Sequence, residues 1–304
     1  MTKALRAPFP YFGGKSMVAA TVWERFGNTP NYVEPFAGSL AVLLARPHRG
    51  NYETVNDADG FVVNFWRAVQ AAPDSVAGYA SYPPFESDVH ARSAWLVEQR
   101  EGLTAALEAD PEFFDARVAG WWVWTVSLLI GDEAALHRTP RSLPAYGSRR
   151  GVHSTQKNIP ALMAALCERL RHVRVACGDW SRVVKPSLCE APALPVAVFL
   201  DPPYGASDIH QSLYAYTSAT TASEVRAWAV EHGDNPAYRI ALCGYRGEGH
   251  EELTDLGWSV HEWQARGGYG NQGKGNANRF RETIWFSPHC LPPASATLFD
   301  RLTA

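Results

Sequence analysis

The chain has 304 residues, of which 46% are hydrophobic and 19% charged, and its formal net charge is -3. This length and this richness in apolar and aromatic residues are typical of a globular protein with a sizeable core, and they exclude a disordered or fibrous chain. No apolar run of about 18 residues occurs and no basic start leads into one, so we expect neither membrane insertion nor secretion, and a cytoplasmic location.

The predicted elements alternate between strands and helices along most of the chain. Helical patterns cover residues 16–26, 61–70 and 222–230, and strand patterns cover 32–34, 52–56, 173–177, 196–200, 239–243, 258–263 and 283–286. Such alternation is typical of an α/β fold with a doubly wound, mostly parallel sheet.

The alternation stops between residues 72 and 171. Helical patterns at 91–107 and 111–129 lead there into a basic segment with Pro and Gly, residues 138–160. We therefore predict an inserted, mainly helical domain at 72–171 within a core formed by 1–71 and 172–304.

Cysteine and histidine spacing indicates neither a disulfide framework nor a metal site. The five cysteines are far apart, with no Cys-x-x-Cys pair, and no set of His, Cys and carboxylate residues has ligand spacing. We expect free thiols and no bound metal; the cysteines are Cys167, Cys177, Cys189, Cys243 and Cys290.

The most specific motif is Asp201-Pro202-Pro203-Tyr204, which follows the apolar strand pattern of residues 196–200. Two prolines end a strand, and ligands of parallel sheets bind beyond such strand ends. A carboxylate and a main-chain carbonyl can accept hydrogen bonds from one amino group there, while the tyrosine ring offers a face for a planar base. The alternative is a simple strand-ending turn.

This motif resembles the catalytic motif of amino-methyltransferases that modify adenine or cytosine in DNA. Residues 32–39, Tyr-Val-Glu-Pro-Phe-Ala-Gly-Ser, resemble the cofactor loop of that family, and residues 10–15, Pro-Tyr-Phe-Gly-Gly-Lys, resemble the N-terminal motif of its Dam-like adenine branch. The motifs also follow the order of that branch. The resemblance implies a Rossmann-like S-adenosylmethionine-dependent fold, with the insertion as target-recognition domain.

The resemblance also implies the residues of the active site. Asp201, Pro202, Pro203 and Tyr204 would be catalytic, and the cofactor would contact Tyr11, Lys15, Glu34, Pro35, Phe36, Gly38, Asp57, Asp179 and Asp201. Lys15 would pair with the methionine carboxylate of the cofactor and Asp57 would accept from its ribose hydroxyls. Asp59 suits a helix N-cap, and Asp179 suits either a cap or a contact with the cofactor adenine. The loop departs from the family at Leu40, where a second glycine is common.

Basic residues cluster in the predicted insertion. Basic runs are usually solvated loops, but the neighbouring catalytic motif favours contact with DNA phosphates. The predicted DNA contacts are Arg138, Arg141, Arg149, Arg150 and Lys157.

The resemblance therefore implies methyl transfer from S-adenosylmethionine to the exocyclic amino group of adenine in double-stranded DNA, by base flipping. A restriction endonuclease counterpart is a further partner that fits this activity. The alternatives are transfer to RNA adenine, to cytosine in DNA or to a protein glutamine, and a non-catalytic DNA-binding protein.

Overall fold

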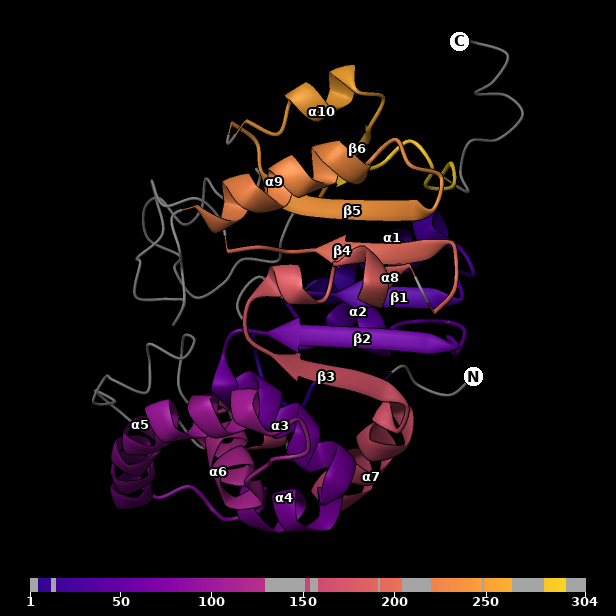
Figure 1. The fold of residues 1–304 in the computed structure, drawn as a ribbon. Coiled ribbons are helices and arrows are strands. Elements are labelled where there is room, and N and C mark those ends of the chain that lie inside the picture. Colours follow the sequence, from indigo (N-terminus) through magenta and orange to yellow (C-terminus); the bar gives the residue numbers. More distant parts are fainter. Residues whose placement is uncertain are drawn as a thin grey trace.

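The computed structural model describes residues 5–11, 15–128, 151–153, 158–190, 192–203, 220–247, 249–263 and 282–293. Within them the chain forms a seven-stranded sheet flanked by helices (Figure 1). The strands are β1 (Asn31–Glu34), β2 (Tyr52–Asp57), β3 (Val173–Cys177), β4 (Val196–Leu200), β5 (Tyr238–Tyr245), β6 (Ser259–Glu262) and β7 (Glu282–Phe286). Each lies close to its expected range, so the predicted strands are confirmed.

The strand order is β3-β2-β1-β4-β5-β7-β6. Strands β1 to β5 pair in parallel, while β7 is antiparallel to both β5 and β6, so the predicted mostly parallel sheet is confirmed. The chain runs outward from β1 through β2 to β3 and then returns to β4 on the other side of β1. This reversal makes the carboxyl ends of β1 and β4 a topological switch point, where open α/β sheets bind ligands.

Both faces of the sheet are buried at its central strands, which explains the continuous apolar sequence of β4. Tyr32 and Phe199 pack into one hydrophobic cluster, whereas Val33, Val198 and Leu200 pack into the cluster on the opposite face. Because alternate side chains of a strand point to opposite faces, both sets of positions must be apolar in a doubly covered sheet.

The helices lie on both faces and beside β3 (Figure 1). Their bounds are α1 (Ala19–Phe26), α2 (Ala41–Leu44), α3 (Gly60–Ala71), α4 (Pro73–Ala80), α5 (Glu86–Ala109), α6 (Ala116–Val126), α7 (Ile159–Leu170), α8 (Pro186–Cys189), α9 (Thr221–His232) and α10 (Glu252–Asp255), with the 3-10 turns η1 (Lys15–Met17), η3 (Gly151–His153) and η4 (Trp180–Arg182). No helix in the described part of the chain has the length and apolar character needed to cross a membrane.

Two helices begin later than the sequence pattern predicted. The pattern at 16–26 divides into η1 and α1, and the pattern from residue 111 becomes α6, which begins at Ala116. Asp115 sets the start of α6, because its Oδ1 accepts a hydrogen bond from the Val118 amide at 2.9 Å and so satisfies a free amide of the first turn.

Helices α4 to α7 gather around α3 beside β3 (Figure 1). Three polar side chains of α3, three residues apart, face this group. The Asn64 amide nitrogen donates to the Asp115 carbonyl at 2.9 Å, and the Arg67 guanidinium donates to the Leu107 carbonyl at 3.1 Å. The Gln70 amide nitrogen donates to the Leu170 and Val173 carbonyls at 2.6 and 2.8 Å. The helices of residues 72–171 are therefore tied to α3 through buried polar contacts.

Candidate active site

The loops after β1, β2 and β3 meet at one edge of the sheet, where Asn56 joins them. Its side-chain nitrogen donates to the Pro35 carbonyl at 3.1 Å and to the Gly178 carbonyl at 2.9 Å. Asn56 is buried, and its Oδ1 atom has no hydrogen-bond partner in the described part of the chain. The sequence pattern did not single out this residue, because only the assembled sheet brings the three loops together.

Gly38 lies at the centre of the predicted cofactor loop, with a φ of +44°. A Cβ atom there would lie 2.5 Å from Cε1 of Tyr11, so the ring of Tyr11 packs against bare backbone. The Gly38 amide donates to Oδ2 of Asp57 at 2.8 Å, and its carbonyl accepts from the indole of Trp66 at 2.9 Å. The N-terminal motif, the cofactor loop and the end of β2 are thus in direct contact.

Leu40 occupies a left-handed conformation, with a φ of +53°, directly before α2. This is the position where the sequence lacks the glycine common in the family, and the leucine is fully buried. The loop therefore keeps a conformation that suits glycine, and the buried side chain offsets the backbone strain.

Glu34, at the end of β1, is 2% exposed and accepts a hydrogen bond from the Tyr32 hydroxyl at 2.8 Å. Burial raises its pKa to about 8; the Tyr32 hydrogen bond opposes this shift and the nearby Asp201 charge adds to it.

Asp57 ends β2 and accepts hydrogen bonds from the Gly38 and Asp59 amides, the latter at 2.9 Å. Burial, followed by the charge of Asp59, raises the pKa of Asp57 to about 7. Asp59 caps α3 by accepting from the Phe61 amide at 2.8 Å, so its predicted role as an N-cap is confirmed.

Asp179 follows β3 and caps η4. Its carboxylate accepts from the Ser181 amide at 2.9 Å, and the side chain is exposed. The next residue, Trp180, stacks on Phe36 with ring centroids 6.1 Å apart and an angle of 26°. The capping alternative for Asp179 therefore holds in this structure, and an aromatic pair lies beside it.

Asp201 follows β4 and forms an ion pair with Lys15, whose Nζ lies 2.9 Å from Oδ2 of Asp201. The Lys15 side chain is 4% exposed and that of Asp201 is 21% exposed. Burial disfavours the charge of Lys15, but the surrounding acidic groups together, with Asp201 contributing most, outweigh this effect and raise the pKa of the lysine above its ordinary value. The ion pair holds the two distant motifs together at the switch point.

Glu282, the first residue of β7, is a further carboxyl group at this site. It is 7% exposed and interacts electrostatically with Lys15 and Asp201. The sequence pattern indicated no chemical role for Glu282, because β7 reaches the site only through its antiparallel pairing with β5.

Several predicted residues lie outside the described part of the chain. These are Tyr204 of the catalytic motif and the predicted DNA contacts Arg138, Arg141, Arg149, Arg150 and Lys157. The five cysteines carry free thiols, as expected. No group of three or more His, Cys, Asp or Glu residues that could hold a metal ion occurs among the described residues.

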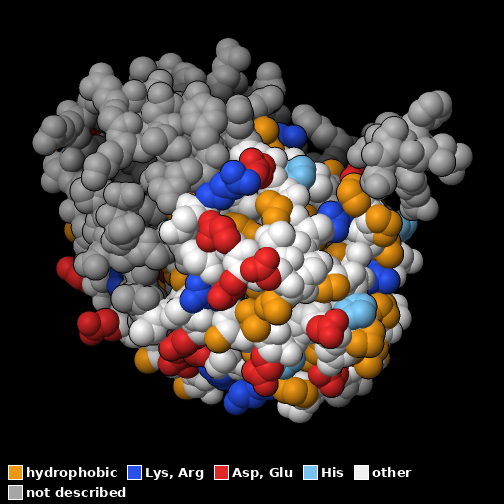
Figure 2. Space-filling model, turned by 90° about the horizontal axis from the view of Figure 1, so that it is seen from above, with side chains coloured by type: hydrophobic (Ala, Val, Ile, Leu, Met, Phe, Trp, Pro, Cys, Tyr) orange, Lys and Arg blue, Asp and Glu red, His pale blue; other side chains and the backbone are white. Residues whose placement is uncertain are grey.

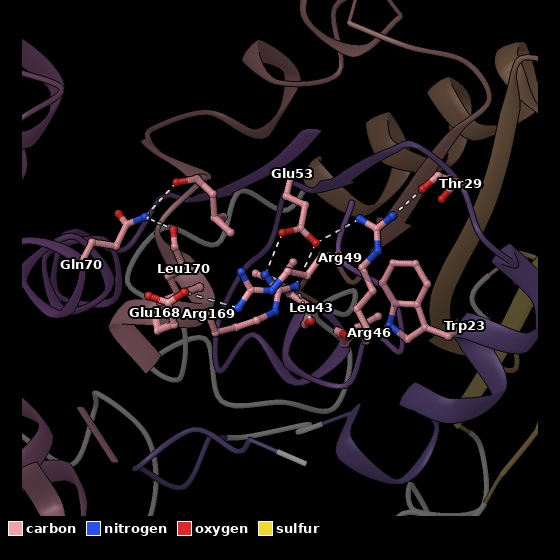
Figure 3. Close-up of polar contacts among 12 residues, drawn as sticks. Trp23, Thr29, Leu43, Arg46, Arg49, Glu53, Gln70, Glu168, Arg169 and Leu170 are labelled. Carbon is pink, nitrogen blue, oxygen red and sulfur yellow. Dashed lines mark hydrogen bonds and ion pairs between the residues drawn. The ribbon is translucent and has the colours of Figure 1, made fainter. Parts of the chain in front are cut away.

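Arg169, within the predicted insertion, makes its contacts in the interior of the protein. Arg169 in α7 donates to both carboxylate oxygens of Glu53 in β2, at 2.7 and 2.8 Å (Figure 3). Arg46 donates to the same carboxylate at 3.0 Å and lies 4.8 Å from the ring centre of Trp23. A buried carboxylate is stable only with such partners. Arg169 therefore links α7 to the sheet, and its guanidinium group is held by Glu53.

Residues 11–117 match the family model of the D12 class N6 adenine-specific DNA methyltransferases. This part of the chain is similar to that family. No curated protein matches the chain.

The match confirms the family resemblance and the enzyme class, adenine-specific DNA methyltransferase. The matched residues of this methyltransferase include Lys15, the Gly38 loop and Asp57. Asp201 lies beyond them, yet the ion pair with Lys15 places it in the same site. The structure thus connects the family segment to the predicted catalytic motif.

Proposed function

We propose that this methyltransferase transfers a methyl group from S-adenosylmethionine to the N6 amino group of adenine in duplex DNA, with Asp201 at the reacting nitrogen. The observation that supports this most is the Lys15–Asp201 ion pair at the topological switch point.

The residues at this edge fit S-adenosylmethionine. Four carboxyl groups surround the site: Glu34, Asp57, Asp201 and Glu282. Among the described residues, the cation beside them is Lys15. Asp201 is paired with Lys15, and Asp57 and Glu282, whose pKa values are about 7, add negative charge as they ionise. This negative charge complements a cationic ligand. When bound, S-adenosylmethionine would supply an electrophilic methyl group carried on a sulfonium.

Each part of the cofactor has a matching group in the chain. The bare backbone at Gly38 leaves room for the ring of Tyr11, and the Asp57 carboxylate suits ribose hydroxyls. Phe36 and Trp180 offer aromatic surface for the adenine ring, beside Asp179. Glu34, Pro35 and Tyr11 would line the rest of this site, and Lys15 would lie near the carboxylate of the methionine moiety while it pairs with Asp201.

The target adenine would bind at the Asp201 motif. The Asp201 carboxylate and the Pro202 carbonyl would accept the two amino hydrogens, and Tyr204, after Pro203, would stack on the base. These contacts aim the nitrogen lone pair at the methyl group and stabilise the positive charge that develops on nitrogen. Asp201 would not deprotonate the neutral amine first. The nitrogen–methyl bond would form as the methyl–sulfur bond breaks, and the extra proton on the methylated nitrogen would then pass to solvent.

The base has to leave the duplex to reach this site, at a cost of a few kcal/mol that DNA binding must supply. We assign that binding to the predicted insertion, residues 72–171, and to Arg138, Arg141, Arg149, Arg150 and Lys157. The face over α9 and α10 suits phosphates poorly, because it carries many exposed acidic side chains, Glu224, Glu231, Asp234, Glu251, Glu252 and Asp255 (Figure 2).

A salt titration tests the assignment of the DNA contacts. Replacing Arg149 and Arg150 with alanine should reduce the slope of log affinity against log salt by about 2, because each lost phosphate contact removes roughly one unit. The control is Arg246→Ala, which removes an exposed arginine that pairs with Glu262. A double variant with the wild-type slope would exclude phosphate contact by these residues.

The test of the function itself is tritiated methyl transfer from S-adenosylmethionine to unmethylated duplex DNA, followed by nucleoside analysis. We expect N6-methyldeoxyadenosine. Methylated cytosine, methylated RNA or a methylated protein glutamine would identify one of the other substrates, and DNA binding with no methyl transfer to any of them would identify a non-catalytic protein. A cytoplasmic location and a restriction endonuclease counterpart remain predictions from the sequence.

A further inference from the structure

Glu282 reaches the active-site edge because of its place in the sheet. It is the first residue of β7 and pairs with Tyr245, the last residue of β5. Since β7 runs opposite to its neighbours, its first residue lies at the edge where the parallel strands end. That edge carries Glu34 and Asp201.

The Glu282 carboxyl group is buried and incompletely bonded. Glu282 is 7% exposed, and its Oε2 atom has no hydrogen-bond partner among the described residues. A buried carboxylate is stable only when a charge or hydrogen bonds compensate it. Among the described residues, the cation that interacts with Glu282 is Lys15, which also pairs with Asp201.

We propose that Glu282 is a positioning residue that shares the Lys15 ammonium group with Asp201 and thereby preserves the negative charge of Asp201 for the substrate amino group. Asp201 holds the lysine directly, at 2.9 Å, and Glu282 acts on the same ammonium group from β7. A lysine attracted by two carboxylates neutralises each of them less than a lysine held by one. This inference rests on the proposed function, in which Asp201 binds the amino group that is methylated.

The charge of Glu282 changes in the neutral pH range. Burial raises its pKa to about 7; Lys15 opposes that shift and Asp201 adds to it. The other titratable groups that interact with Lys15 or Asp201 here are Cys243 and Glu34. Burial raises the Cys243 pKa well above its ordinary value, so this thiol stays protonated over the same range.

The first test compares kcat for methyl transfer from pH 6 to pH 8.5 in the wild type and in Glu282→Gln. Glutamine has the shape of the protonated acid, so the two proteins should be equally active at pH 6. At pH 8.5 the variant should be about tenfold slower, the size of an effect equal to one pKa unit. Glu282→Asp should retain the pH dependence of the wild type.

The matched control is Glu262→Gln on the neighbouring strand β6, where an exposed glutamate pairs with Arg246. It should follow the wild type at every pH. If Glu282→Gln is equally impaired at all pH values, Glu282 has only a structural role. If the variant is as active as the wild type at every pH, Glu282 has no role in the reaction. Either result overturns the proposal.

A second measurement does not depend on activity. The chain has five lysines, so [ε-13C]lysine labelling gives few NMR signals, and Lys15→Arg assigns the one for Lys15. The Lys15 signal should change between pH 6 and pH 8.5 in the wild type as Glu282 ionises, and this change should be smaller in Glu282→Gln. A Lys15 signal with the same pH dependence in the two proteins overturns the proposal. If the wild type transfers no methyl group, the proposed function fails, while this titration still decides whether Glu282 acts on Lys15.

Discussion

The Nζ atom of Lys15 lies 2.9 Å from Oδ2 of Asp201, and this contact joins the beginning of the chain to the end of the fourth strand. Lys15 lies within the segment that matches the D12 class family, whereas Asp201 lies outside it. The pair keeps a charged carboxylate at the switch point of the sheet, where an amino group could bind.

Asp201→Asn should lower kcat for methyl transfer by about 100-fold to 1000-fold, the usual loss when one preorganised electrostatic group is removed. S-adenosylmethionine should still bind with an affinity within a few-fold of the wild type, as measured by calorimetry. Lys185→Gln, which removes an exposed lysine, is the control and should have normal activity. Full activity in Asp201→Asn would exclude Asp201 from catalysis.

Asp57→Asn should weaken S-adenosylmethionine binding roughly 10-fold to 100-fold, because a hydrogen bond to a charged group contributes about 1.5–3 kcal/mol. The pKa of Asp57 is raised to about 7, mainly by burial, so the wild-type affinity should increase as the carboxyl group ionises between pH 6 and pH 8. The variant should lack this increase, which calorimetry at each pH can measure.

Asp59→Asn is the matched control for this experiment. Asp59 caps α3, and asparagine is an equally good N-cap, so cofactor affinity and its pH dependence should remain those of the wild type. If the control weakens binding as much as Asp57→Asn does, the effect comes from the loop structure rather than from a contact with the cofactor.

The left-handed backbone of Leu40 leads to a prediction about stability. Leu40→Ala and Leu40→Gly should both destabilise the protein by about 2–5 kcal/mol, since each removes a fully buried side chain. Glycine should be the better replacement by about 1 kcal/mol, because it adopts a positive φ without strain. Urea unfolding measures both free energies.

Leu43, also fully buried but inside α2, provides the comparison. In a helix glycine is less favourable than alanine by about 1 kcal/mol, so Leu43→Gly should be less stable than Leu43→Ala. The order of the two replacements should therefore reverse between positions 40 and 43. The same order at both positions would mean that the backbone at Leu40 carries no strain.

Glu34 should make the protein less stable as the pH rises. Its folded pKa, raised to about 8 chiefly by burial, exceeds the ordinary value of 4.5, so the folded state holds a proton that the unfolded state has lost. The stabilisation is complete below the unfolded pKa and is lost as the pH rises through the folded one, by at most about 1.4 kcal/mol per pH unit. Glu34→Gln should reduce this loss between pH 5 and pH 8.

Urea unfolding at several pH values measures that loss, and Glu262→Gln, at an exposed site, should keep the wild-type slope. Some slope should remain in Glu34→Gln, because burial also raises the pKa values of Asp57 and Glu282 to about 7. An unchanged slope in Glu34→Gln would show that Glu34 ionises normally in the folded protein.

The sequence alone predicts the strands well, for a physical reason. A strand buried on both faces must be apolar throughout, so residues 196–200 are visible as a strand without any partner, and Pro202 and Pro203 mark its end. The helix starts were less well predicted, because a cap such as Asp115 decides the first residue and several acidic residues precede α6.

The sequence by itself predicted the α/β fold class from local patterns along the chain, and the resemblance of its motifs to a known family predicted the enzyme class. The tertiary structure alone decided that Lys15 meets Asp201, that Asn56 joins three loops and that Glu282 adds a carboxyl group to the site. These residues come from strands and loops far apart in the chain, and the pairing of the strands brings them to one edge. Charge and burial act through space, so the pKa values and partners of these groups depend on that assembly rather than on their neighbours in sequence.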